Sequence, residues 1–314
     1  MLLENVRNLA SHDGGNTWRV IHDSIIEAGY NVIDEPVIFS PHYIGVPQHR
    51  ERVFIMCVRK DIADLPPFYF NPDRMPKCSI DSILLKDDEI DDLARYQLKP
   101  EMIEWIDNWN EFLQGIKCDK LPGFPIWADS LCAMKDNPMI GDWDNMPKWE
   151  QNFIRKNSEL WEQNKEFIDK WLIKAKKNPL FFGSKAKLEW QAGETKHPDL
   201  WEHIMQIRPS GLRVKPGTYF PALVAITQTS IVGKKKRYLT PRECARLQSF
   251  PDTFMYDVKN AQAYKQFGNS INVGLVRLFA EYMFGDKEVQ RKYSYKVQFG
   301  KEDEGPTLFD DLDE

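Results

Sequence analysis

Residues 53–58 form an unbroken apolar run, Val-Phe-Ile-Met-Cys-Val. A strand with no polar position on either side is typical of a sheet covered on both faces, because a strand with one wet face alternates polar and apolar residues. Residues 31–39 predict another strand, and apolar residues at helical spacing predict a helix over 16–28, capped by Asn16 or Thr17 and ended by Gly29. This order predicts part of a doubly wound α/β sheet.

The middle of the chain differs from its two ends in amino-acid composition. Prolines cluster at 66, 67, 72 and 76, and nine of the ten tryptophans lie between 105 and 201. Residues 147–177 predict one long amphipathic helix that ends before Pro179. We expect most of the tryptophans to be packing residues in the core of an inserted domain.

Residues typical of helix starts and ends occur again from about residue 240. Residues 240–243, Thr-Pro-Arg-Glu, predict a helix start with a capping box and a proline in the first turn. Residues 268–270, Gly-Asn-Ser, predict the start of another helix that ends before Gly285. The chain therefore reads as an α/β piece, a large insertion and a second α/β piece.

Charge is unevenly distributed along the chain. The net charge is −5, but residues 301–314 hold seven acids and one lysine, whereas residues 205–237 hold four lysines and three arginines and no acid. A basic stripe of this kind is compatible with a nucleic-acid partner. The five cysteines form no paired spacing and no zinc ligand set, no apolar stretch is long enough to span a membrane, and no signal peptide opens the chain. These features predict a cytoplasmic protein without a metal site.

Three short segments carry candidate chemistry. Glu4 ends a short apolar strand, which would deliver a carboxylate to the rim of a sheet. Alternation places Arg50 and Arg52 on one side of the segment before the apolar run, where two guanidinium groups need a strongly accepting partner. Residues 268–270 would offer backbone N–H groups at a helix N-terminus. Each segment alone is commonly structural.

Together, these segments resemble a known family. Residues 3–9, 45–52, 238–252 and 262–270 are similar, in this order, to the Glu-Asn-Val, Gln-x-Arg-x-Arg, Leu-Thr-x-Arg-Glu and Gly-Asn-Ser segments of the DNA cytosine-5 methyltransferases of bacterial and phage restriction-modification systems. The resemblance implies an incomplete doubly wound, Rossmann-like methyltransferase sheet with an inserted target recognition domain. It divides the chain into catalytic residues 1–60, a DNA-binding recognition domain at 61–235, a return segment at 236–286, and an extension with an acidic tail at 287–314.

The resemblance also implies roles for single residues. Glu4 matches the glutamate that hydrogen-bonds N3 and the exocyclic amine of the target cytosine, and Arg52 matches the arginine that holds the base carbonyl. Arg50 matches an arginine near the nucleophile, while Asn269 and Ser270 match positions beside the methionine part of S-adenosylmethionine. Base flipping out of double-stranded DNA is implied.

The Pro-Cys-Gln segment that carries the family's nucleophile, and its glycine-rich cofactor turn, are not found in the sequence. We therefore expect this chain to be inactive alone and to need a complementary N-terminal subunit or a missing N-terminal segment. The alternative is a catalytically inactive DNA-binding or regulatory remnant, and an RNA methylase of the same family is a third hypothesis. The candidate DNA contacts are seven basic residues: Arg208, Arg213, Lys215, Lys234, Lys235, Lys236 and Arg237. The alternative is a solvated surface, and for the run at 234–237 we favour DNA contact.

Overall fold

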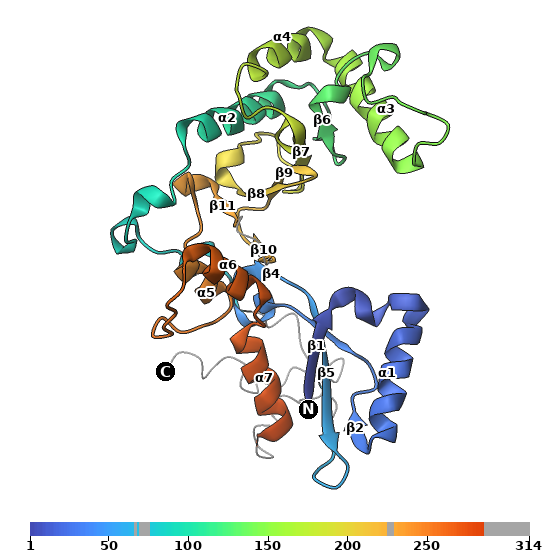
Figure 1. The fold of residues 1–314 in the computed structure, drawn as a ribbon, viewed down its shortest axis with the longest axis vertical. Coiled ribbons are helices and arrows are strands. Elements are labelled where there is room, and N and C mark those ends of the chain that lie inside the picture. Colours follow the sequence, from blue (N-terminus) through green and yellow to red (C-terminus); the bar gives the residue numbers. More distant parts are fainter. Residues whose placement is uncertain (66–67, 69–75, 225–228, 286–314) are drawn as a thin grey trace, which may run out of the picture. The chain divides into compact units, whose positions relative to one another are not determined.

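A computed structural model describes residues 1–65, 68, 76–224 and 229–285. The predicted acidic tail lies outside the described residues. The chain divides into two compact units, the first formed by Met1–Ile83 with the segment from Pro241 onward, and the second by Leu84–Thr240 (Figure 1). The structure is mixed helix and sheet, as the predicted α/β class requires. Short 3-10 helices occur in several of the connections.

The first unit is built around one strand. Strand β5 (Arg52–Arg59) pairs with β1 (Leu2–Val6) along one edge, and with β2 (Tyr30–Val32) and β3 (Val37–Phe39) along the other. The predicted strand at 31–39 is thus interrupted in its middle. Every one of these pairings with β5 is antiparallel. The connection from β3 to β5 contains a 3-10 turn (Pro41–Ile44) and a two-residue strand (Gln48–His49) and no crossover helix, which is consistent with an antiparallel pairing.

Helices cover both faces of this sheet, as the apolar run predicted. Helix α1 (Asn16–Glu27) lies on one face and α7 (Val273–Phe284) on the other (Figure 1). Val53, Ile55 and Cys57 pack on the α1 side, whereas Phe54 and Met56 pack on the α7 side. The rings of Phe54 and Phe279 lie 4.4 Å apart. Fully burying a side chain of this size contributes about 1.5–3 kcal/mol, so β5 is the centre of the unit's core.

The remaining elements of the first unit are short. They are β4 (Gln48–His49), α5 (Pro241–Leu247) and α6 (Asn260–Asn269). Proline begins α5, as predicted. The prediction that residues 268–270 start a helix is wrong, because Gly268 and Asn269 end α6. Helix α7 begins three residues later, where the Asn272 side chain accepts a hydrogen bond from the Leu275 N–H.

The second unit contains helices packed on a six-stranded sheet of order β12-β11-β8-β9-β7-β6. The prediction of one helix over 147–177 is wrong, since Asn164 separates α3 from α4. The bounds are α2 (Pro100–Gly115), β6 (Ile126–Trp127), α3 (Lys148–Gln163), α4 (Lys165–Ala175), β7 (Lys187–Trp190), β8 (Ile204–Arg208), β9 (Gly211–Lys215), β10 (Phe220–Pro221), β11 (Ile231–Val232) and β12 (Arg237–Tyr238).

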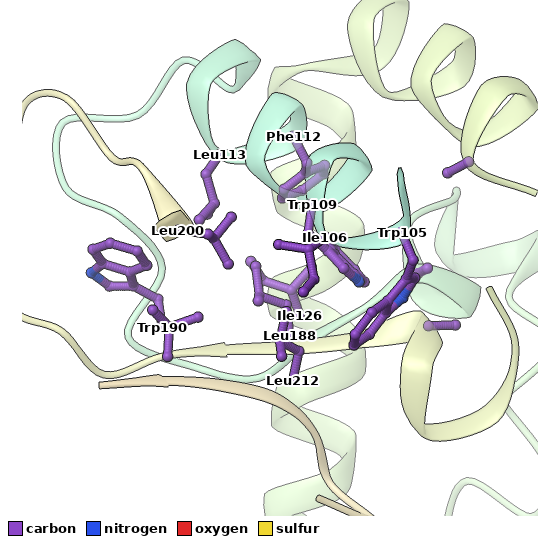
Figure 2. Packing of buried hydrophobic residues seen from close by; sticks show 14 of the residues in the cluster. Trp105, Ile106, Trp109, Phe112, Leu113, Ile126, Leu188, Trp190, Leu200 and Leu212 are labelled. Atoms are coloured by element: carbon purple, nitrogen blue, oxygen red, sulfur yellow. The ribbon is translucent and has the colours of Figure 1, made fainter. Parts of the chain in front are cut away.

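Tryptophans supply much of the second unit's core. Trp105 and Trp109 of α2 are fully buried and both donate their indole N–H to the Lys185 carbonyl, at 2.7 and 3.1 Å. They pack with apolar residues of β7 and β9, among them Leu188 and Leu212 (Figure 2). Trp149 of α3 is an exception to the expectation that the tryptophans pack in the core, because it is 57% exposed. This core cluster lies on one face of the sheet, and the other face carries the polar Glu189, Gln206 and Arg213 together with the buried Ile204 and Val232.

Candidate active site and nucleic-acid interface

Glu4 and Arg52 form an ion pair at one end of the first unit's sheet. The register pairs Glu4 with Phe54 and Val6 with Arg52, and strand alternation then directs Glu4 and Arg52 to the face that α7 covers. The Arg52 Nε lies 3.0 Å from a Glu4 carboxylate oxygen, and both side chains are about one-fifth exposed, at 21% and 19%. The structure thus brings together two residues that are 48 positions apart in the sequence.

Arg50 is held more deeply than Arg52. Its two terminal nitrogens donate to the carbonyls of Gly268 and Ser270, each at 3.1 Å, and its backbone N–H donates to the Ser40 hydroxyl at 2.9 Å. Burial lowers the pKa of Arg50 to about 10, and the neighbouring Arg52 charge adds to this effect. Arg50 therefore joins the strand that precedes β5 to the segment between α6 and α7.

His49 and Glu51, which alternate with these arginines along the chain, point elsewhere. His49 stacks on His42 with ring centroids 5.0 Å apart, and the Glu51 carboxylate pairs with Arg7 at 2.5 Å. Burial, followed by the His49 charge, lowers the pKa of His42. Glu51 and Arg7 form a second carboxylate–guanidinium pair near the first, which makes them useful controls for it.

Two glutamines were missed by the sequence analysis. Gln48 and Gln248 are fully buried, and neither side-chain amide has a hydrogen-bond partner among the described residues. A buried amide without a partner costs about 1–3 kcal/mol, so such groups are unusual outside functional or hydrated sites. Both lie inside the segments that carry the family resemblance, which is the only sequence signal that could have found them.

The Asn269–Ser270 segment offers polar groups to a ligand. Asn269 is exposed, and its side chain has no hydrogen-bond partner among the described residues. The Ser270 hydroxyl donates to the Phe267 carbonyl at 2.9 Å, and the Ser270 backbone N–H is used by the Gln266 carbonyl. The exposed Asn269 amide is therefore accessible to a ligand. The expected helix N-terminus does not occur at this position.

The cysteines do not provide an activated thiolate in the described part of the chain. Cys57 and Cys244 are buried. Burial raises the pKa of Cys57, Cys78, Cys118 and Cys132. A raised pKa disfavours the nucleophilic form. Among the residues that the structure describes, no group of three His, Cys, Asp or Glu side chains could hold a metal ion.

In the second unit, three predicted DNA-binding residues share one sheet face. Arg213 pairs with Glu189, with its Nε 2.9 Å from the carboxylate, and a terminal nitrogen of Arg208 donates to the Gln206 side-chain oxygen at 3.0 Å. Lys215 lies on the same face of β9 as Arg213. Burial lowers the pKa of Arg208 and of Lys215, and in both cases Arg213 adds to the effect.

The basic run at 234–237 is largely engaged within the unit. Lys234 pairs with Glu202 at 2.8 Å, Lys235 pairs with Asp87 at 3.3 Å, and the Lys236 ammonium lies 4.7 Å from the centre of the Trp201 ring. Arg237 is 1% exposed and donates to the carbonyls of Tyr238 and Leu85. Lys234, Lys235 and Lys236 stay predicted phosphate contacts. Arg237 is buried, and its side chain bonds backbone carbonyls of the protein.

A family model for C-5 cytosine-specific DNA methylases matches residues 1–285. The chain belongs to this family. It is 32% identical to the Type II methyltransferase M.AluI of Cellulosimicrobium cellulans, across 88% of this chain and 69% of that protein. It is 24% identical to the Type II methyltransferase M.HhaI of Haemophilus parahaemolyticus, across 89% of this chain and 61% of that protein. Family membership confirms the resemblance seen in the sequence, and methyltransferases of this family use S-adenosylmethionine as the methyl donor.

Solved structures with a likeness to the chain are also methyltransferases. They include the Entamoeba histolytica methyltransferase EhMeth, 14% identical with a TM-score of 0.39, and S. pombe Dnmt2, 16% identical with a TM-score of 0.38. The match covers 91% and 90% of this chain but only 62% and 65% of those chains. No helix in the described residues is long and apolar enough to cross a bilayer.

Proposed function

We propose that this chain supplies the cytosine pocket and the target recognition domain of a DNA cytosine-5 methyltransferase in a restriction-modification system. The whole enzyme transfers a methyl group from S-adenosylmethionine to C5 of a cytosine that has been flipped out of double-stranded DNA. The first unit forms the pocket, and residues 61–235, most of which lie in the second unit, form the recognition domain. The proposal places the enzyme in the cytoplasm.

The Glu4–Arg52 pair is the observation that carries this proposal. Attack on C6 of cytosine makes C5 electron-rich, provided that N3 of the ring receives a hydrogen bond or a proton. A carboxyl group next to a guanidinium group, 3.0 Å apart, matches the neighbouring N3 and carbonyl oxygen of cytosine. In this assignment Glu4 acts on N3 and the exocyclic amine, and Arg52 donates to the carbonyl.

S-adenosylmethionine, when bound, supplies the electrophilic methyl group. We assign its methionine end to Asn269 and Ser270, because the exposed Asn269 amide can hydrogen-bond a carboxylate or an ammonium group. Arg50 fixes this segment through the carbonyls of Gly268 and Ser270. The same arginine is also the candidate for favouring a nearby thiolate.

The nucleophile is assigned to residues outside this sequence. No cysteine in the 314 residues follows a proline, and burial raises the pKa of Cys57, Cys78, Cys118 and Cys132. Strand β1 pairs only with β5 among the described residues, so its other edge is available for a further strand. Both observations support a preceding segment or a companion chain as the source of the cysteine and of the remaining sheet.

The test is methyl transfer in a restored enzyme. The chain is combined with the product of the reading frame immediately upstream, and label from S-adenosylmethionine is measured on a mixed-sequence DNA duplex. Glu4→Gln keeps the size of the side chain but cannot supply a proton, so the rate should fall by about 10²–10⁴ with little change in DNA affinity. Glu51→Gln is the matched control, since Glu51 also pairs with an arginine and should leave the rate unchanged.

Three results would count against the proposal. A restored enzyme whose turnover is unaffected by Glu4→Gln would remove Glu4 from the pocket. Transfer by the purified chain without added protein would show that the nucleophile lies within it. A restored complex that binds DNA but never methylates it would favour the alternative, an inactive DNA-binding or regulatory module.

A further inference from the structure

The second unit's sheet presents one face that is not part of its hydrophobic core. Strands β7, β8 and β9 direct most of their apolar side chains to the core on the other face, whereas Ile204 is buried on this face beside Lys215. The register places Gln206, Arg213 and Glu189 opposite one another across the three strands. A row of polar side chains across a sheet is a shaped surface, because strand pairing fixes the spacing of its groups.

Arg213 is oriented by a buried carboxylate. The Glu189 side chain is 8% exposed and accepts hydrogen bonds from the Arg213 Nε at 2.9 Å and from the Gln191 side chain at 3.0 Å. The Arg213 side chain is 30% exposed, and its two terminal nitrogens have no hydrogen-bond partner in the described part of the chain. A guanidinium tied at Nε has a fixed plane, so these two nitrogens form a pre-organised donor pair.

Arg208 is held in a related way. One terminal nitrogen donates to Gln206, whose amide nitrogen donates in turn to the Ser230 hydroxyl at 3.2 Å. The Arg208 Nε is buried and has no partner among the described residues. With Lys215 nearby, three cations share this face with Glu189 as their carboxylate partner. Three partly buried positive charges with one carboxylate are electrostatically unfavourable. Binding of an electron-rich acceptor would lower this free-energy cost.

These residues differ from the basic run 234–237 on the same unit. Lys234 and Lys235 are 60% and 39% exposed and are flexible point charges, which suits contacts with phosphate. A half-buried guanidinium with a fixed plane matches the O6 and N7 acceptors of guanine, which a planar donor pair can bind together. The major groove also admits β-structure.

We propose that Arg213, held by Glu189, and Arg208, held by Gln206, are base-reading residues that recognise guanine in the major groove of DNA. This inference rests on the proposed function, which makes the second unit the recognition domain. It separates the predicted DNA contacts into two kinds, with base readers on the sheet face and phosphate contacts in the run at 234–236.

The experiment selects sequences with the full chain. A duplex library with a random central segment is enriched by binding, the preferred duplex is identified, and its affinity is compared with that of duplexes carrying 7-deazaguanine, which lacks the N7 acceptor, at each guanine in turn. We expect one such substitution to weaken binding roughly fivefold or more. Arg213→Lys keeps the charge and the pairing with Glu189 but loses the planar donor pair. It should lose this discrimination while binding unrelated duplexes unchanged.

Controls keep the outcomes distinct. Lys120→Gln removes an exposed ammonium that pairs with Glu194 and should alter neither measurement. Tryptophan fluorescence of each variant reports whether the second unit remains folded. Failure of the wild-type chain to bind any duplex at low salt would contradict the proposed function itself. Binding without sequence enrichment, or an Arg213→Lys variant that discriminates as before or weakens all duplexes alike, would overturn base reading and leave DNA binding intact.

Discussion

Replacing Arg50 by methionine should loosen the segment between α6 and α7. Methionine keeps a long buried side chain but removes the two hydrogen bonds to the carbonyls of Gly268 and Ser270. Hydrogen bonds from a charged group contribute about 1.5–3 kcal/mol each. Part of this gain is offset, since burial disfavours the charged guanidinium and lowers its pKa to about 10. We therefore expect a net local loss of about 2 kcal/mol, which corresponds to a roughly thirtyfold change in an opening equilibrium.

Hydrogen exchange measures this opening directly. The backbone N–H groups of Ser270 and Val273 donate to the carbonyls of Gln266 and Gln248, both at 2.9 Å, and so report on the segment. Their protection factors should fall roughly thirtyfold in Arg50→Met. Because the folded-state pKa lies below the ordinary value, the burial cost is constant at neutral pH and declines only as the pH rises through about 10. The effect should thus be the same between about pH 6 and 9.

Arg52→Met is the matched control for this experiment. Arg52 donates to the Glu51 carbonyl at 2.8 Å and pairs with Glu4, and among the described residues it makes no hydrogen bond to residues 268–273. Its replacement should leave the protection of Ser270 and Val273 unchanged. Unchanged protection in Arg50→Met would refute the reasoning, because it would show that Arg50 does not hold these carbonyls.

Three further predictions concern stability. The lowered pKa of His42 means that the folded state resists protonation of this side chain. The backbone N–H groups of residues 40–50 should therefore lose protection from hydrogen exchange as the pH falls from about 7 to 5. His42→Asn should remove this acid sensitivity. Gly233→Ala would place a Cβ 2.4 Å from the Trp201 carbonyl oxygen and should destabilise the second unit by about 1–3 kcal/mol in urea unfolding followed by fluorescence, whereas Gly123→Ala has open space and should be neutral. Limited proteolysis should leave a resistant fragment within residues 84–240; rapid loss of the whole chain without such a fragment would contradict an independent core there.

The sequence predicted what depends on local pattern. The apolar run in β5 required cover on both faces, and the structure provides it with α1 and α7. Alternation correctly separated Arg52 from Glu51 because a strand has a period of two. The helix break at Asn164 was not predictable, since its cause is remote. The Asn164 side chain binds both backbone groups of Lys117, at 2.6 and 3.3 Å, and these contacts outweigh an apolar stripe that continues through the break.

The candidate site shows the same limit. Its residue types could be identified from the motifs, but the partners of Arg50 lie more than 200 positions away in the chain. The acidic partners of Lys234 and Lys235 are likewise distant, which is why the run at 234–237 looked like free positive charge. Arg237 illustrates this most clearly, because the Leu85 carbonyl that it donates to and the Asp87 carboxylate that it faces lie far from it in the sequence.

The two arginines of the pocket have different physical roles under the proposed function. The Glu4–Arg52 pair is partly exposed, and ion pairs of that kind contribute about 0–1 kcal/mol. A cytosine that enters can therefore replace this pairing with hydrogen bonds to both groups at little cost, while the pair keeps the two groups in position beforehand. Arg50 is buried, and removing its bonds would leave two carbonyls without their donor. Substitution of Arg52 should consequently affect retention of the flipped base, whereas substitution of Arg50 should first affect the segment that we assign to the cofactor.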